Sequence, residues 1–536
     1  MKTIIKSILI ILLLTIVSCN DLTEEVFSDI TVETYSYSAN DIYAVIGPVY
    51  LNMRELHDVW GYSIAQETSS DEMVMPANAS GWDDGGIYKK FHLHTWNAEA
   101  EQVQNMWTDM YTGVMHANRI IDQLETNAVP VPSDVTRESL IAEMKVARAF
   151  YYWLLIDNFG DVPFVTAPSV ELHTLTPRAT IFAAIVTDIK DALDKLSAEN
   201  NIKMYGRFNK WGAKTLLANL YLNSEVYTGT ADWEKCLAEC NDVIASGKYN
   251  LEANYTDCFK AHNENSIETI FAWPMDELQR STLINAHILH EASKAKYNLR
   301  HTPWGAGCDK AITQFINTYD PDDERIDATW DRGPQFAADG TTPLLCSYDK
   351  AGQQLDYTKE IPNGLYTAEN EGWRLTKFKP EMGAAYRMNN DIPFFRYAQI
   401  LMMKAECLLR TGQADAAAVI VSQVRQRAFK NNPAKATVTG ANLTANTKYQ
   451  YGYVENYVIV DPGDQTPVEI GGFYDELGYE FVGEWNKRRD MIRFGTYSTK
   501  SWLSHKPKGE GINVFPIPQN YLDANPNIEQ NPAYLK

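Results

Sequence analysis

Carboxylates are the most numerous groups in this sequence that could carry out a reaction. Two carboxylates that face each other across a cleft can hydrolyse a glycosidic bond. Acids lie close together at Glu67, Asp71, Glu72, Asp83 and Asp84. The chain holds 69 Asp and Glu residues in all, so such pairs arise by chance and do not by themselves predict an enzyme.

Three short motifs could also hold a reactive group or a metal ion. SYDK at 347–350 fits a Ser-x-x-Lys pattern, but the partner motifs of penicillin-recognising enzymes are missing. FHLH at 91–94 places two histidines on one side of an expected strand and could begin a zinc site, yet no third ligand is apparent. TYDPDDER at 318–325 offers carboxylates to calcium but lacks the twelve-residue loop pattern. The sequence therefore predicts no catalytic residue, no metal and no cofactor.

Charge and aromatic content favour binding of a neutral partner instead. The net charge of -21 opposes nucleic acids and other polyanions, because the long-range field repels them. The chain has 13 Trp, 30 Tyr and 19 Phe, and the flat apolar face of a sugar ring stacks well on such rings. Most of these aromatics are expected in the core, but a few exposed ones would suit a carbohydrate.

The N-terminus has the layout of an export signal. Lys2 and Lys6 precede an apolar run at 8–17 that is too short to span a bilayer. The run leads into Cys19, which predicts a signal peptide over 1–18 and lipidation of Cys19; the alternative is a secreted protein with a chance cysteine. Asp21 and Glu24 follow, as in the export tag of surface lipoproteins of some Gram-negative bacteria.

The elements that must position any site are mainly helical. Apolar spacing predicts helices over 41–57, 104–124, 138–158, 180–196, 392–410, 413–427 and 474–491, and a tetratricopeptide-like pair within 209–246. Residues 251–390 are rich in Gly, Pro, Asp and Asn, with a short strand at TIFAW, so we expect an irregular region suited to binding. Cys236 and Cys240 lie one turn apart in a helix and are interpreted as buried apolar residues, not a disulfide.

Four ordered stretches point to a known family. They are ARAFYYWLLIDNFGDVPF, PFFRYAQILMMKAECLLRTGQ, EFVGEWNKRRDMIRFG and FPIPQNYLDANPNIEQNPAY. Together with the lipidation motif they resemble the SusD/RagB family of surface glycan-binding lipoproteins, over about residues 40–536. In these stretches Arg148 and Arg396 each need a carboxylate or carbonyl partner, for which Glu406 and Glu484 are candidates.

The resemblance implies a mostly α fold, with four tetratricopeptide-like helix pairs and an irregular loop-rich lobe packed on them. It places a lipid-anchored segment at 19–39 and a SusD-like domain at 40–536, with a helical scaffold at 40–250 and 391–430, a ligand-binding region at 251–390, and a C-terminal helix and tail at 473–536. It also implies a non-catalytic protein at the outer membrane surface. Its partner would be a SusC-like TonB-dependent transporter, which receives the glycan and faces the helical part.

The resemblance places ligand-binding loops after the first long helix and in the irregular region. In the first, ANASGWDDGGIYKK presents Trp82 as a stacking ring and Asp83 and Asp84 as acceptors for sugar hydroxyls. In the second, KAKYNLRHTPWGAG presents Tyr297 and Trp304 with Arg300 beside them.

The expected ligand is a neutral glycan, with a long plant β-glucan such as xyloglucan or mixed-linkage glucan as the specific guess. Two alternatives stay open: an interaction protein that holds a peptide or protein on its helices, and a glycoside hydrolase.

Overall fold

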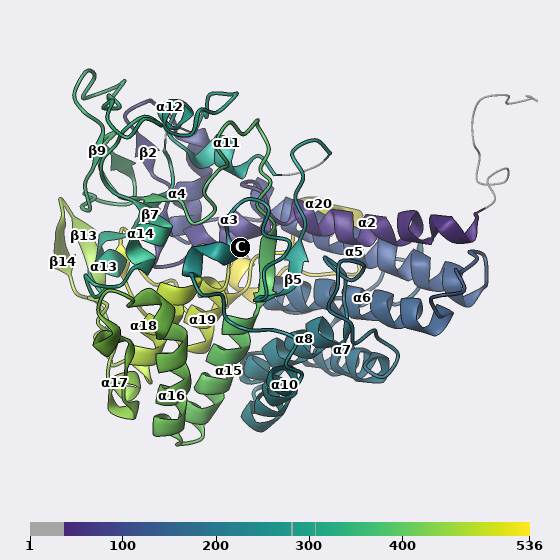
Figure 1. Cartoon of the computed structure of the whole chain (residues 1–536). Coiled ribbons are helices and arrows are strands. Elements are labelled where there is room, and N and C mark those ends of the chain that lie inside the picture. The colour runs from purple at the N-terminus through teal and green to yellow at the C-terminus, as the bar shows by residue number, and fades with distance from the viewer. Residues whose placement is uncertain (1–36, 280–281, 306, 536) are drawn as a thin grey trace, which may run out of the picture.

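The computed structural model describes residues 37–279, 282–305 and 307–535 and consists of a helical scaffold and a loop-rich lobe (Figure 1). The signal peptide and Cys19 lie outside the described residues. Within those ranges, no helix combines the length and the apolar character needed to cross a bilayer. The structure is 44% helical and 10% strand, which confirms the mostly α class.

The N-terminal half of the scaffold forms where the apolar spacing predicts helices. Its main helices are α2 (Ile42–Glu55), α5 (Glu101–Glu125), α6 (Arg137–Phe159), α7 (Arg178–Ala192), α8 (Lys210–Leu222) and α10 (Trp233–Ala245). The side chain of Thr136 caps α6 by accepting a hydrogen bond from the Ser139 N–H. Helices α5 and α6 approach closely at Gly113, where any Cβ would lie 2.1 Å from the ring of Tyr151. Glycine is therefore required for this contact.

The C-terminal half differs from the prediction at two places. Residues Ile392–Arg396 form strand β12, which pairs with β5 (Thr269–Trp273), so helix α15 begins only at Tyr397 and runs to Arg410. The residue at 393 is proline, which cannot donate to a helical hydrogen bond. The helix expected over 474–491 is two helices, α18 (Gly471–Phe481) and α19 (Lys487–Arg493). Gly483 and Trp485 between them have positive φ angles of 74° and 60°, which break a helix.

The helices pack in contacting pairs, α5 with α6, α8 with α10, α15 with α16 (Ala414–Arg425), and α18 with the shorter α17 (Gly440–Thr444). Helix α10 also packs on α15 and so joins the two halves of the scaffold. In Figure 1 the loop-rich lobe lies around α11 (Ile284–Ile288) and α12 (Ser293–Tyr297), with the pair α5–α6 to its right and the other pairs below.

The lobe is built from short elements, as its composition predicts. Its short elements include α3 (Tyr62–Thr68), β1 (Met73–Val74), β2 (Ala77–Asn78), α4 (Ile87–His92), β6 (Lys310–Ala311), β7 (Trp330–Asp331), β10 (Tyr366–Thr367), β11 (Arg374–Leu375), β13 (Gly452–Glu455), β14 (Val458–Asp461) and β15 (Trp502–Leu503). Four of these strands form a sheet with the order β1-β6-β11-β7.

Buried ion pairs hold strand β12 against α18. The Arg396 guanidinium is fully buried and contacts Glu268 at 2.7 Å, Glu480 at 2.8 Å and Glu484 at 2.6 Å. The predicted pairing of Arg396 with Glu484 is thus confirmed. The partner of Arg148 is Asp188, at 2.8 Å.

The other predicted acid has a different partner. Glu406 does not contact Arg148; it pairs with Arg493 of α19 at 2.8 Å, and with Arg410 at 2.9 Å. Arg488 donates to the Asn513 carbonyl at 2.6 Å, so α19 fixes the C-terminal tail. Cys236 and Cys240 are free and buried, as predicted.

Candidate functional site

Two large aromatic rings lie exposed beside each other at the edge of the loop-rich lobe. The side chains of Trp304 and Tyr386 are 41% and 49% exposed, and their ring centroids are 5.5 Å apart. The buried His301 ring stacks on Tyr386 at 4.7 Å and backs the pair. We call Trp304, Tyr386 and His301 the aromatic platform. Because its two outer rings are open to solvent, it can accept the apolar face of a ligand ring.

The loop that carries Tyr386 is fastened to the segment that carries Trp304. Nη2 of Arg300 contacts both carboxylate oxygens of Glu277, at 2.8 and 3.0 Å, and its Nε donates to the Gly383 carbonyl at 2.8 Å. The backbone N–H of Gly383 donates to the Tyr297 carbonyl at 2.8 Å. Arg300 is therefore engaged in holding this loop in place.

Tyr297 does not offer its ring to a ligand in this structure. Its side chain is only 8% exposed and packs in a small core with Tyr88 and Leu299. The expectation that its loop would leave the ring exposed is wrong, because residues 293–297 form the short helix α12, which turns the ring inward. The part of Tyr297 that contacts the Tyr386 loop is its backbone carbonyl, which accepts from the Gly383 N–H.

Trp82 lies at the end of a tight turn after strand β2. The Asn78 side chain accepts hydrogen bonds from the backbone and the hydroxyl of Ser80, and the Ser80 hydroxyl accepts one from the Trp82 N–H. The indole is partly buried and stacks on Tyr88 at 5.5 Å with an angle of 14° between the rings. One face of the indole is thus covered by Tyr88.

The two acids that follow Trp82 differ in their surroundings. Asp83 forms an ion pair with Lys89 at 2.6 Å, which engages its carboxylate. Asp84 is exposed, and its Oδ2 lies 3.9 Å from Nε2 of His287. Burial lowers the pKa of His287 to about 4, so its ring is neutral at physiological pH. Asp84 therefore keeps acceptor capacity toward a ligand hydroxyl.

Helix α11 brings the two predicted loops together. The Trp304 N–H donates to the Ala286 carbonyl of α11 at 2.9 Å. The next residue of the helix, His287, contacts the Trp82 ring edge-on at 5.6 Å. The Trp82 turn and the aromatic platform therefore flank the same short helix, a proximity that the sequence did not reveal.

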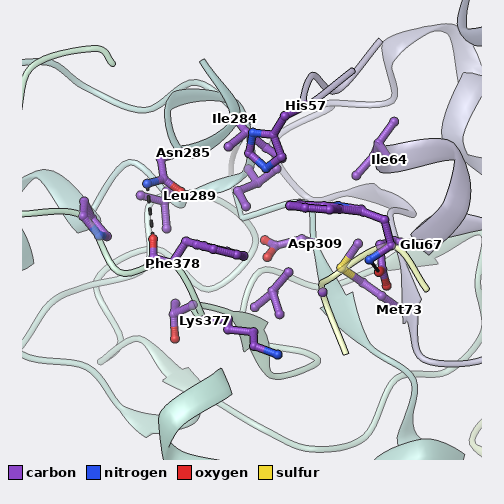
Figure 2. Close-up of a pocket in the computed structure, with 16 residues that line it drawn as sticks. His57, Ile64, Glu67, Met73, Ile284, Asn285, Leu289, Asp309, Lys377 and Phe378 are labelled. Atoms are coloured by element: carbon purple, nitrogen blue, oxygen red, sulfur yellow. Dashed lines mark hydrogen bonds between the residues drawn. The ribbon is translucent and has the colours of Figure 1, made fainter. Parts of the chain in front are cut away.

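A small cavity lies on the inner side of α11 (Figure 2). It is lined by Ile284 and Asn285 of the helix and by His57, Glu67 and Asp309. Burial raises the pKa of Glu67 to about 7 and lowers that of His57 to about 3. The volume of about 30 Å³ holds roughly two water molecules, far less than a sugar ring needs. These titratable groups therefore do not form a site for a carbohydrate.

Residues of the two other candidate motifs, TYDPDDER and SYDK, form contacts within the protein. Asp320 and Asp322 bind Lys435 at 2.7 and 2.8 Å, and Asp323 binds Arg325 at 2.6 Å. Ser347 is exposed, and its N–H donates to Glu369 at 2.7 Å. Across the described ranges, no group of three or more His, Cys, Asp or Glu residues is placed to hold a metal ion.

The histidine motif FHLH is helical where a strand was expected. His92 ends α4, and His94 follows in a turn with a φ of 50°. The ring of His94 lies 4.0 Å from that of His505, and His92 Nε2 accepts a hydrogen bond from the Ser504 N–H at 3.2 Å. The histidines therefore bind the C-terminal tail to the lobe and are buried there.

Tyr386 was missed by the sequence reasoning. It lies in MGAAYRMNND, a polar segment rich in small residues. The same kind of composition indicates that Trp82 lies in a loop, and it could have indicated this for Tyr386 too. Two other aromatic residues of the lobe do not offer their rings to a ligand, since Trp330 is 2% and Tyr357 is 4% exposed. Trp373 is partly buried, and Arg332 lies 5.4 Å from its ring centroid.

Comparisons with known proteins agree with this architecture. A family model described as "Starch-binding associating with outer membrane" matches residues 25–222, and the model of the SusD family matches residues 220–534. A SusD-like protein of Formosa agariphila is 24% identical, with 96% of each chain covered. The starch-binding protein SusD of Bacteroides thetaiotaomicron is 25% identical, with 84% of this chain and 82% of that protein covered.

Solved structures show the same fold. A laminarin-binding SusD-like protein superposes with a TM-score of 0.69 at 20% identity, over 93% of this chain and all of that chain. Surface glycan-binding protein A from Bacteroides thetaiotaomicron, in complex with laminarihexaose, superposes with a TM-score of 0.64 at 20% identity, over 92% of this chain and 99% of that chain. The second family model alone covers more than half of the sequence, and the chain therefore belongs to the SusD/RagB family of glycan-binding proteins.

Proposed function

We propose that the chain binds a neutral glycan, without cleaving it, on the surface formed by the aromatic platform and the Trp82 turn. The observation that carries this proposal is the exposed pair Trp304 and Tyr386, held beside each other by a fastened loop. Asp84 adds an acceptor for sugar hydroxyls. Tyr297 contributes through its backbone, and Arg300 and Asp83 contribute through their ion pairs.

The family supplies the setting for this binding. We propose that Cys19 is lipidated, that the protein sits on the outer surface of a Gram-negative outer membrane, and that it delivers the glycan to a SusC-like TonB-dependent transporter. The helical scaffold would face the transporter, and this leaves the loop-rich lobe open to the glycan.

The ligand is expected to be an uncharged β-glucan. The net charge of -21 opposes anionic polysaccharides. Xyloglucan and mixed-linkage glucan remain the specific proposal, and laminarin joins them because structurally similar proteins are described as laminarin-binding or hold laminarihexaose. Each stacked ring contributes on the order of 1 kcal/mol, so two or three rings supply less than the roughly 4 kcal/mol of a millimolar complex. Hydrogen bonds to the sugar hydroxyls must supply the rest, and binding is expected to be weak.

Affinity electrophoresis tests the proposal. Native gels would contain laminarin, xyloglucan or mixed-linkage glucan, and the wild type would run beside Trp304→Ala, Tyr386→Ala and Trp82→Ala. Tyr43→Ala is the matched control, because Tyr43 is 46% exposed but lies on α2 of the scaffold. Retardation by one glucan that the platform variants lose and the control keeps is the expected result. Migration unaffected by every glucan would contradict the proposal.

The alternative of a protein-binding scaffold has one observation in its favour. A groove of about 870 Å³ runs between α5 and residues 165–173, and Met115 and Val170 on its walls are exposed. A protein partner held there is compatible with glycan binding on the other lobe. The hydrolase alternative is tested in the same electrophoresis samples, since release of reducing sugar over time would select it.

A further inference from the structure

An exposed tyrosine outside the platform lies on the same backbone ladder as the Trp82 turn. Strand β10 pairs in parallel with β2, and Tyr366 is opposite Ala77. The Ala77 N–H donates to the Leu365 carbonyl, and the Asn78 N–H donates to the Trp82 carbonyl, both at 3.1 Å. Strand β2 thus connects Tyr366 on one side with Trp82 on the other.

The side chain of Tyr366 points outward from this ladder. Successive residues of a strand point to opposite faces, and the neighbours Thr367 and Asn78 are buried. Tyr366 is 52% exposed, and Leu365 beside it is 40% exposed. The outer side of β10 therefore offers the Tyr366 ring to solvent on the strand that pairs with β2.

The backbone beneath Tyr366 is held rigidly. The Asn363 side chain accepts hydrogen bonds from the N–H groups of Leu365 and Tyr366, at 2.9 and 3.1 Å. The Gly364 N–H donates to the Ser504 hydroxyl at 2.9 Å, and a Cβ at Gly364 would lie 2.5 Å from Nε2 of His92. Because this segment is already ordered, a ligand that stacks on Tyr366 pays little ordering entropy.

We propose that Tyr366 is a second stacking position for the same glycan, beyond the platform and the Trp82 turn. The inference rests on the proposed function. Two strand spacings separate the Tyr366 and Trp82 backbones, roughly 10 Å. The occupant is a linear neutral glycan long enough to reach from the platform past the Trp82 turn to Tyr366, and oligosaccharides too short for this span fill the platform alone.

Chain length is the variable that tests this inference. Isothermal titration calorimetry would use three series of neutral oligosaccharides of increasing length, namely β-1,3-gluco-, mixed-linkage gluco- and xyloglucan oligosaccharides. In the series that the wild type binds, Tyr366→Ala should weaken the longest members roughly fivefold, the effect of one stacked ring, and leave the shortest binding members unchanged. Trp304→Ala should weaken every length.

Two further variants separate stacking from folding. Tyr366→Phe keeps the ring and should bind every length as the wild type does, and Tyr43→Ala controls for loss of an exposed tyrosine elsewhere. Thermal unfolding of Tyr366→Ala checks that the lobe is intact. Wild-type affinity of Tyr366→Ala at all lengths, or a loss equal at all lengths, would overturn the inference while the proposed function stands. Absence of wild-type binding to all three series would overturn both.

Discussion

At the scale of single residues, Trp304 and Tyr386 are exposed because their backbones are tied down, not because their loops are loose. The Trp304 N–H is bonded to α11, and the Tyr386 loop is tied to Arg300 and Tyr297. A ring held in this way loses little entropy when a sugar stacks on it. The polar groups around the platform therefore act mainly by positioning the rings.

A double-mutant cycle tests the positioning role of Arg300. Arg300→Ala should weaken glycan binding a fewfold, because Gly383 of the Tyr386 loop loses the hydrogen bond from Arg300, which the ion pair with Glu277 holds in place. In a Tyr386→Ala background the same change should have almost no further effect, since coupled residues are not additive. Affinities from calorimetry give the coupling, and additive losses would instead mean that Arg300 contacts the glycan directly.

His57, on the cavity under α11, should make stability depend on pH. Burial lowers its pKa from 6.5 to about 3, while the unfolded chain titrates near 6.5. Between these values only the unfolded state binds the proton, so the group lowers the free energy of unfolding by about 1.4 kcal/mol per pH unit as the pH falls below 6.5.

The comparison with His57→Gln isolates this contribution from the other titratable groups. Urea unfolding from pH 7 to pH 4 should show that the stability of the wild type relative to the variant decreases by about 1.4 kcal/mol for each pH unit below 6.5. Parallel curves for the two proteins would show that His57 titrates normally in the folded state.

At the scale of elements, the periodicity of apolar residues predicts the long helices. It does not predict where an apolar stretch changes from strand to helix. Helix α5 was predicted at 104–124 and runs over Glu101–Glu125, because its apolar stripe repeats for six turns. The short apolar run IPFFR is predicted as helix. It forms strand β12 because it pairs with β5, which is distant in the sequence. The local sequence does not determine such pairing.

The candidate site was predictable in part for the same reason. Trp82 and Trp304 stood out as rings among loop residues, and the structure places both beside α11. The prediction that Tyr297 offers its ring to a ligand is wrong, because a five-residue helix turns the ring inward. Tyr386 comes near Trp304 through contacts such as that of Gly383 with Arg300, which is 83 positions away, and no local pattern encodes such a contact.

The ion-pair cluster between β12 and α18 should dominate the stability of this junction. Arg396→Met would leave Glu268, Glu480 and Glu484 buried without their shared cation. Breaking such a buried network costs about 3–5 kcal/mol, measured as a lower free energy of unfolding in urea. Arg332→Met is the control, because its ion pair with Asp327 is exposed and should contribute less than about 1 kcal/mol. Equal losses for the two variants would contradict the account.

At the scale of the whole molecule, the scaffold and the lobe divide the work. The helix pairs bury most of the large core. The loop-rich lobe packs against them (Figure 1) and carries the exposed rings of Trp304 and Tyr386. The net charge of -21 opposes anionic ligands, so the proposed function requires selection of the ligand by its apolar faces and hydroxyls instead of by charge.

This division predicts how binding responds to salt. Affinity for a neutral glucan should stay constant between low and high sodium chloride, because stacking involves no net charge and only charged partners are screened. Calorimetric titrations at both salt levels check this, with dextran sulfate as an anionic comparison that should fail to bind at low salt. Affinity for the neutral glucan that falls steeply as salt is added would contradict the account.

The most direct test of the account is the affinity of the Trp304→Ala/Tyr386→Ala double variant for the glucan that retards the wild type, measured by isothermal titration calorimetry. The account predicts loss of detectable binding while the thermal unfolding of the variant stays like that of the wild type. Unchanged affinity in a folded double variant would show that the glycan does not stack on these two rings.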